Sequence, residues 1–380
     1  MLRPMSAHRT IPARRRALLF GLLPLLSLLG GCKWWVLAPA GDIAAQQRDL
    51  LVISTLLMLV IIVPVIATTI LFAWRYRHSN RQARYEPDWD HSTQLELLIW
   101  AAPLLIIICL GAITWSGTHL LDPYRPLERI GRNRPVPAEV EPLRVEVVAL
   151  DWKWLFIYPE QGVAAVNELV LPVDRPVALH ISASSVMNAF YAPALAGMIY
   201  AMPAMETRLH AVLNRPGTYQ GFSANYSGAG FSGMHFTLRG VTAEEYERYV
   251  KELRAGGDRL DRQAYLELER PSENVPVRHY GRVEAGLFNA VVNLCVEPGR
   301  MCQHQMMEVD ARGGLGLAGI YNVARLDYDK HHRRGAVFGP AWAWVTGLCG
   351  PGDPLPVSPL PLRVANNEPL RGMGLPEPGR

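Results

Sequence analysis

Two long apolar stretches in the first third of the chain constrain its fold more than any other feature. They run from Leu50 to Trp74 and from Leu95 to Trp115, and each is long enough to cross the hydrocarbon core of a bilayer as a helix. Both end in tryptophan, a residue enriched at membrane interfaces. No comparable stretch follows residue 120, so the sequence predicts a membrane hairpin followed by a soluble region.

A shorter apolar run, from Ala17 to Leu29, precedes this hairpin and follows the basic residues Arg14 to Arg16. A basic start with a short apolar core is the layout of a secretory signal. The run leads into Leu-Gly-Gly-Cys at residues 29–32, which resembles a lipobox. We therefore expect a lipoprotein signal peptide at 1–31 and lipidation of Cys32, with palmitate among the acyl groups. The alternative is an uncleaved signal anchor with an incidental cysteine.

The orientation of the hairpin follows from its charges and from the lipobox. Four arginines (Arg75, Arg77, Arg81 and Arg84) lie between the spans, which places this loop in the cytoplasm by the positive-inside rule. Four more arginines follow the second span, which weakens this argument from loop charge. A lipidated N-terminus lies outside, and two crossings return the chain outside. We therefore expect a bacterial inner-membrane protein, lipid-anchored and multi-pass, with a periplasmic soluble domain.

The soluble region begins with short runs rich in β-branched residues, separated by turn residues. Examples are Leu143–Leu150, Glu168–Val173, Val177–Ile181 and Glu206–Leu213, and Thr242 with Glu245 forms a capping box that opens a helix. The predicted organisation is a periplasmic N-terminal segment at 32–49, a transmembrane hairpin at 50–119 with its cytoplasmic loop at 75–94, a connector at 120–142, an all-β domain at 143–240, a C-terminal extension at 241–348 with a helix near 242–254, and a disordered tail at 349–380.

The five cysteines and the net charge narrow the function further. A formal charge of +4 without a concentrated basic face argues against a nucleic-acid partner. Cys109 lies in a span, whereas Cys295, Cys302 and Cys349 face an oxidising compartment. Cys295 and Cys302 lie in a soft-ligand cluster with Met301, His304, Met306 and Met307. We predict a disulfide between Cys295 and Cys302; a pairing of either with Cys349, or a copper or zinc site, are the alternatives.

Three segments of the soluble region, Ser185–Phe190, Ile199–His210 and Pro216–Phe236, closely resemble subunit II of cytochrome bo-type ubiquinol oxidases, in the haem-copper oxidase superfamily. The resemblance covers roughly residues 30–300 and keeps the order of the family's parts. It implies that the β domain is a cupredoxin-like Greek-key sandwich or barrel, after a two-helix hairpin and before a short helical C-terminal extension.

The related subunit II of cytochrome c oxidases binds two copper ions in this domain, with one histidine before a loop that reads Cys-x-Glu-x-Cys-x3-His-x2-Met. Thiolates bridge the coppers there, and imidazole and thioether ligands complete the site. Aligned without gaps, the histidines fall on Asn188 and Ser232, the cysteines on Ala224 and Gly228, the glutamate on Tyr226 and the methionine on His235, next to Met234. No side-chain ligand is present, so we expect no metal or cofactor in this chain.

Haem is also expected elsewhere, because the two spans contain no histidine except His119 at the outer end. By resemblance, haems and copper lie in subunit I. The predicted function is that of an accessory, structural subunit of a proton-translocating ubiquinol oxidase, with subunit I, the other subunits and membrane lipid as partners and ubiquinol reached through the complex. The alternatives are a stand-alone membrane lipoprotein that binds or delivers copper, and a cytochrome c oxidase subunit II, which Ala224 and Gly228 disfavour.

Two further features of the sequence carry predictions. Glu96 opens the second span on the same helical face as Trp100 and Pro103. By resemblance it lies at the cytoplasmic mouth of a proton channel; the alternative is a solvated interfacial carboxylate near the helix N-terminus. The aromatic residues Trp152, Trp154, Phe156 and Tyr158 share one face if they lie in a strand, and we expect that face to contact the core or subunit I.

Overall fold

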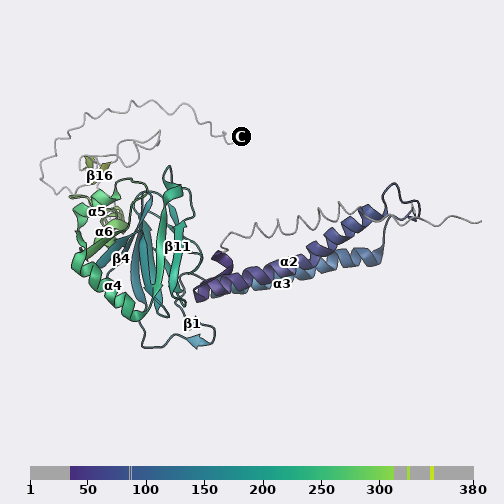
Figure 1. Cartoon of the computed structure of the whole chain (residues 1–380). Coiled ribbons are helices and arrows are strands. Elements are labelled where there is room, and N and C mark those ends of the chain that lie inside the picture. The colour runs from purple at the N-terminus through teal and green to yellow at the C-terminus, as the bar shows by residue number, and fades with distance from the viewer. Residues whose placement is uncertain (1–34, 85, 87, 312–322, 326–342, 346–380) are drawn as a thin grey trace, which may run out of the picture. The chain divides into compact units, whose positions relative to one another are not determined.

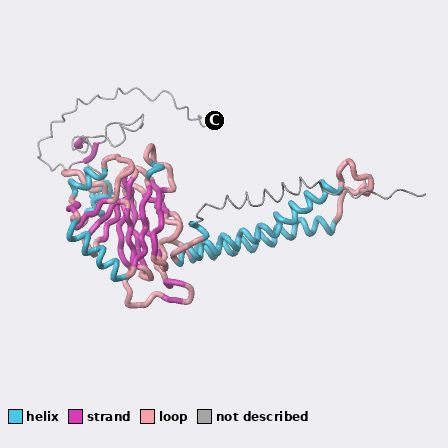
Figure 2. Tube along the Cα trace, viewed as in Figure 1, coloured by secondary structure: helices cyan, strands magenta, loops and turns pink. Residues whose placement is uncertain are grey.

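The structure is a computed structural model of the chain, and it describes residues 35–84, 86, 88–311, 323–325 and 343–345. These residues form two compact units. The first contains the chain up to Leu120 together with Pro193–Ala196, and the second contains the rest. Figure 2 separates them by secondary structure, since the first is helical and the second holds the two main sheets. The predicted signal peptide, Cys32 and the predicted tail lie outside the described residues.

Two long helices dominate the first unit. After the short 3-10 helix η1 (Trp35–Leu37), α2 spans Asp42–Arg75 and α3 spans Thr93–Leu120. Both are long and apolar enough to cross a membrane by length and composition. At 1.5 Å per residue the 34 residues of α2 extend about 50 Å, more than a hydrocarbon core of about 30 Å. The helix begins at Asp42, before the apolar stretch that starts at Leu50.

The second unit is built on two β-sheets, visible in Figure 1 as the strands around β4 and β11. One sheet has seven strands in the order β10 (Thr207–Val212), β7 (Pro176–Ala183), β3 (Leu143–Leu150), β4 (Lys153–Tyr158), β5 (Val163–Val166), β14 (Arg278–Val283) and β13 (Asp258–Leu260). The other has five, in the order β6 (Glu168–Pro172), β12 (His235–Val241), β11 (Gly217–Ser223), β8 (Asn188–Tyr191) and β9 (Ile199–Ala201). The predicted helical hairpin followed by a cupredoxin-like β domain is confirmed.

The remaining described elements are short. Two-residue and three-residue strands form the pairs β1 (Arg129–Gly131) with β2 (Arg134–Pro135) and β15 (Val323–Arg325) with β16 (Ala343–Val345). The helices of the second unit are η2 (Phe231–Gly233), α4 (Ala243–Gly256), α5 (Arg262–Glu269), α6 (Leu287–Val292) and α7 (Gln303–Ala311).

An aromatic core fills the space between the two sheets. Trp154 and Phe156 on β4 meet Phe190 on β8 and Phe236 on β12, with ring centroids 5.1 to 6.5 Å apart. All four rings are buried. Phe236 lies directly over Gly221 of the neighbouring strand, where a Cβ would come within 2.0 Å of the ring. The glycine in β11 therefore makes room for the ring that closes the core.

The opposite face of the seven-stranded sheet is also apolar, and the C-terminal segment covers it. The strand residues Val148, Leu150, Leu155 and Ile157 cluster with apolar residues from 260 to 296, among them Tyr265, Leu268, Leu287 and Phe288. Strands buried on both faces read as continuous apolar runs, and β4 is such a strand. The segment that we predicted as an extension thus contributes β13 and β14 to the sheet and α5 and α6 to its cover.

Helix α4 starts as the sequence predicts. Thr242 accepts a hydrogen bond from the Glu245 backbone N–H, and the Glu245 carboxylate accepts one from the Thr242 N–H, which completes the capping box. Its apolar face buries Tyr246, Tyr249 and Leu253. Figure 1 shows the helix running along one side of the strands.

Candidate functional site

The loop between β11 and β12, together with the start of β8, carries the positions on which the sequence alignment predicts the lost copper ligands to fall. Asn188 is 1% exposed, and its side-chain oxygen accepts a hydrogen bond of 3.1 Å from Ser223 Oγ. Its amide nitrogen donates to the Val186 carbonyl at 3.2 Å. The polar groups of Asn188 are therefore satisfied by the protein itself, at the position of a histidine ligand.

Hydrogen bonds within the protein also hold both ends of the loop between β11 and β12. The Ala224 backbone N–H donates to Ala189 O at 3.0 Å, which brings the start of the loop beside Asn188. At the other end, His235 Nε2 donates to Ser232 O at 2.8 Å, and His235 is exposed. Met234, beside it, is 1% exposed. At positions 224, 228, 232 and 235 the chain presents a methyl group, a hydrogen, a hydroxyl and an imidazole, and none of these can bridge copper ions as a thiolate does.

Gly228 is the residue predicted to replace the second cysteine, and an indole ring lies against it. Trp152, in the turn before β4, has a φ of 66° and donates from Nε1 to Ser227 O at 3.1 Å. A Cβ on Gly228 would lie 3.0 Å from Trp152 Cζ2, and one on Gly230 would lie 2.4 Å from Trp152 Cδ2. The Trp152 ring thus fills the space beneath the loop.

The aromatic run 152–158 divides into two parts in the structure. Trp154, Phe156 and Tyr158 lie in β4 and point into the core, with side chains fully buried. Trp152 lies outside the strand and supports the loop. The predicted packing against the domain's own core is therefore confirmed for the three strand residues.

A buried lysine, which the sequence analysis did not single out, anchors the turn that carries Trp152. Lys153 is 0% exposed, and its Nζ donates to Ser272 Oγ at 2.6 Å and to Arg270 O at 2.8 Å. Asp151 accepts a hydrogen bond from the Ser185 hydroxyl. The signal in the sequence was a single lysine within the apolar run from Trp152 to Tyr158. Lysine is almost never fully buried unless it is paired, so a lysine in a buried strand indicates that polar partners lie nearby.

A second network that the sequence analysis missed joins α4 and β14 to the five-stranded sheet. The Glu168 carboxylate accepts hydrogen bonds from Tyr249 Oη at 3.1 Å and from His279 Nε2 at 2.9 Å, and Arg239 Nη1 lies 3.2 Å away. Burial raises the pKa of Tyr249 well above its ordinary value, because the phenolate would lose its hydration. Tyr249 therefore stays a neutral donor, and the network ties the C-terminal segment to the sandwich.

Glu96 lies in the first turn of α3, where its backbone N–H donates to Ser92 O at 2.9 Å. Its side chain is exposed, and so are Leu97, Leu98, Ile99 and Trp100 that follow. The structure thus places a carboxylate at the start of an apolar helix, one helical turn before Trp100.

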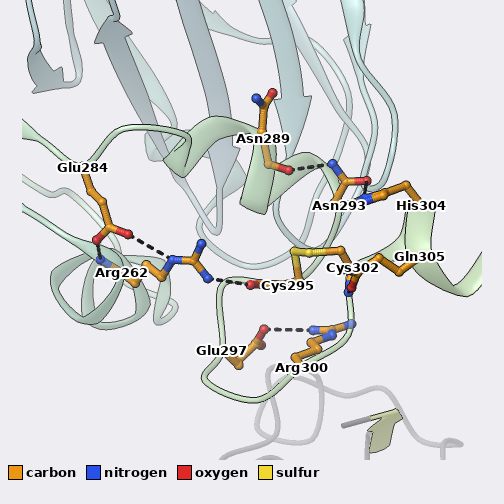
Figure 3. The surroundings of a disulfide bond; sticks show 10 residues. All are labelled: Arg262, Glu284, Asn289, Asn293, Cys295, Glu297, Arg300, Cys302, His304 and Gln305. Atoms are coloured by element: carbon orange, nitrogen blue, oxygen red, sulfur yellow. Dashed lines mark hydrogen bonds and ion pairs between the residues drawn. A yellow bond between two sulfur atoms is a disulfide. The ribbon is translucent and has the colours of Figure 1, made fainter. Parts of the chain in front are cut away.

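Cys295 and Cys302 are joined by a disulfide, with Cα atoms 4.7 Å apart (Figure 3). The bond closes a short loop between α6 and α7, and Cys295 is 2% exposed. Arg262, which is paired with Glu284, donates to Cys295 O at 3.2 Å, and His304 Nδ1 lies 3.1 Å from Asn293 Oδ1. The disulfide occupies both cysteine sulfur atoms of the predicted soft-ligand cluster, so neither is available as a thiolate.

No cluster of three or more histidine, cysteine, aspartate or glutamate side chains able to hold a metal occurs among the residues that the structure describes. Cys109 is a free, exposed cysteine on α3. Cys32 and Cys349 lie outside the described residues, so lipidation of Cys32 stays a prediction. The alternative pairing of Cys349 with Cys295 or Cys302 is contradicted by the disulfide that joins these two.

Two family descriptions match the second unit. Residues 145–241 match the periplasmic domain of cytochrome c oxidase subunit II, and residues 254–299 match the COX aromatic rich motif. The first range covers most of the two sheets. The second covers the segment from β13 to α6 that shields the outer face of the seven-stranded sheet.

Whole-chain relatives are similar over most of their own length. The chain is 46% identical to cytochrome bo(3) ubiquinol oxidase subunit 2 of Pseudomonas putida, over 74% of this chain and 87% of that protein. It is 48% identical to ubiquinol oxidase subunit 2 of Acetobacter aceti, over 73% and 88%. It is 37% identical to quinol oxidase subunit 2 of Bacillus cereus, over 67% and 86%. The chain belongs to the family of cytochrome bo(3)-type ubiquinol oxidase subunit 2.

Proposed function

We propose that this chain is the second subunit of a terminal ubiquinol oxidase, a complex that oxidises ubiquinol, reduces oxygen to water and pumps protons. Its part is structural and accessory. It stabilises subunit I and covers the periplasmic face of that subunit, and it carries no redox centre of its own. Haems and copper belong to subunit I in this proposal.

The observation that carries the proposal is the chemistry of the loop from Ala224 to His235. A subunit that accepts electrons from a periplasmic cytochrome needs a copper pair held by thiolates, and this loop presents a methyl group at 224 and a hydrogen at 228. Trp152 lies where a side chain at 228 would extend. Electrons from a lipid-soluble quinol do not need a site in this domain, which favours ubiquinol over a cytochrome as the donor.

The copper-delivery alternative has less support. Its candidate ligands were Cys295 and Cys302 with the neighbouring methionines and His304, and a disulfide removes both thiolates. A delivery protein also has no use for a two-helix hairpin once it carries a lipid anchor. The long helices α2 and α3 support membership of a membrane complex instead.

We place the protein in the bacterial inner membrane, lipid-anchored at Cys32 and with the soluble domain in the periplasm. Mass spectrometry of the mature N-terminus should find the diacylglyceryl mass on Cys32. Cys32→Ser should block lipidation and cleavage there, while the two helices keep the protein in the membrane. An intact, unmodified signal in the wild-type protein would refute the lipid anchor.

Glu96 is the one residue of this chain that we assign to the reaction, as a proton-uptake group at the cytoplasmic start of α3. Ionisable groups at membrane depth are costly and are usually functional. Support comes from its position in the first turn of an apolar helix and from its exposed side chain.

A blue-native gel of mildly solubilised membranes tests the proposed assembly. This chain should migrate with haem in a complex much larger than its own mass of 42.3 kDa. Migration as a free chain, with the haem elsewhere in the gel, would contradict membership of an oxidase and favour a stand-alone lipoprotein.

A further inference from the structure

A pocket of 550 Å³ lies in the second unit, where the end of α4 meets β13 and β14. Three arginines line it, Arg254 from α4, Arg259 from β13 and Arg282 from β14. Asp258 supplies the one carboxylate, so the charged side chains of the lining carry a net charge of +2. No residue of the loop from Ala224 to His235 lines this pocket.

Two glycines bring the three elements together. A Cβ on Gly257 would lie 2.2 Å from the Gly281 backbone nitrogen, and a Cβ on Gly281 would lie 2.5 Å from Leu253 O. Such separations are impossible for real side chains, so the backbones approach this closely only because both residues are glycine. The close approach places the arginines of three different elements around one opening.

The charges in the pocket are not balanced by the protein. Arg259 and Arg282 are direct partners in the parallel pairing of β13 with β14, and neighbouring strands lie only about 4.8 Å apart. Like charges directly opposite each other on a sheet are destabilising. Arg259 Nε lies 3.9 Å from Asp261, and the Arg282 side chain makes no hydrogen bond or ion pair with any described residue. A bound anion would relieve the repulsion between the Arg259 and Arg282 guanidinium groups.

The third arginine is held in place by the backbone. Arg254 donates from Nη2 and Nε to Gln161 O, at 2.7 and 3.1 Å. This contact fixes its guanidinium at the rim of the pocket and leaves its charge without a carboxylate partner. One ordered arginine and two adjacent ones thus surround the opening.

We propose that this pocket binds a phosphate group. Guanidinium forks match phosphate oxygens in a bidentate geometry, and a phosphate monoester has enough oxygens to accept from Arg259 and Arg282 at once. A carboxylate carries one charge and two oxygens, and it would leave part of the repulsion in place. The volume of 550 Å³ exceeds what a bare phosphate fills. Inorganic phosphate and a lipid headgroup with a terminal phosphate are the two sources of this chemistry.

The test uses the full chain purified in detergent. Inorganic phosphate is titrated by calorimetry at constant ionic strength, which chloride maintains. Arg282→Gln should weaken binding about tenfold or more, the usual loss for a charge-assisted hydrogen bond. Arg282→Lys should be intermediate because it keeps the charge without the fork. The control is Arg248→Gln, which removes the same charge from an exposed position on α4 outside the pocket, and it should bind like the wild type.

Two more probes separate the sources of the ligand. Nanodiscs that contain phosphatidic acid are compared with nanodiscs of phosphatidylcholine; a preference for the former that Arg282→Gln abolishes, without binding of free phosphate, supports the proposal with a lipid as the source. An acidic peptide of glutamates is the third probe. Tighter binding of this peptide than of either phosphate probe, lost in Arg282→Gln, would overturn the proposal in favour of a protein partner. Failure of all probes to bind, or an equal loss in Arg248→Gln, would overturn it outright.

Discussion

At Gly228 the backbone has a φ of +113°, in the region that side chains rarely adopt, and Trp152 lies against the position of a Cβ. The sequence alone identifies which ligands are missing, because residue types are read directly. It cannot reveal that the backbone at 228 and the indole of Trp152 both oppose a side chain at this position. Restoring the ligand residue types would therefore not by itself restore a copper-binding geometry at this loop.

Grafting the copper ligands onto this loop tests whether its backbone and the Trp152 indole exclude a side chain at 228. We expect the variant with Asn188→His, Ala224→Cys, Gly228→Cys, Ser232→His and His235→Met to stay without the purple absorption of a binuclear copper site. A cysteine at 228 must leave the positive-φ region, at a cost on the order of 1–3 kcal/mol, and must displace the indole. Absorption spectra after copper addition check this, with the same variant retaining Gly228 as the control. A purple spectrum from the complete graft alone would contradict the geometry.

Glu96 carries a second prediction about a single side chain. Glu96→Gln keeps the shape of the side chain but removes its titratable proton. If Glu96 collects protons for subunit I, the variant complex should keep its haem content and turn over several-fold more slowly, and Glu96→Asp should be milder. Oxygen uptake with ubiquinol measures the effect. Full turnover in Glu96→Gln, at normal haem content, would eliminate the proton-uptake role.

At the scale of elements, the cover on the seven-stranded sheet explains why the C-terminal segment was hard to assign. The helices α5 and α6 have eight and six residues, and β13 has three, so their patterns are too short to be distinctive. Their apolar residues make sense only against the outer face of β3 and β4. By contrast, α4 carries its own start signal in Thr242 and Glu245 and was predicted within two residues at each end.

The disulfide closes the loop at the end of the segment that covers the seven-stranded sheet. A loop of about eight residues gives an expected stabilisation of roughly 2.5 kcal/mol in the chain-entropy account. Cys295→Ser with Cys302→Ser should therefore lower the denaturant midpoint of the soluble region. Tryptophan fluorescence during urea unfolding of the full chain measures it. Cys109→Ser is the matched control, since Cys109 is free and exposed on α3, and it should leave the midpoint unchanged. An unchanged midpoint in the double variant would show that the loop is held by packing alone.

For the whole molecule, the helical hairpin and the β domain were predictable because each has a strong signal. The spans Leu50–Trp74 and Leu95–Trp115 lie inside α2 and α3, and Leu143–Leu150 is β3 residue for residue. The partners of Lys153, the Glu168 network and the arginine pocket were not predictable, because each joins separate elements that only the tertiary fold brings together.

We infer that this chain serves a quinol oxidase and offers no copper site to which a cytochrome could pass electrons. The most direct measurement is oxygen uptake by the complex purified through an affinity tag on this chain, with ubiquinol and reduced cytochrome c supplied in turn as the donor. We predict haem in the preparation, rapid oxygen uptake with ubiquinol and none with cytochrome c. Uptake driven by cytochrome c, or a purified chain without haem and without activity toward either donor, would contradict the account.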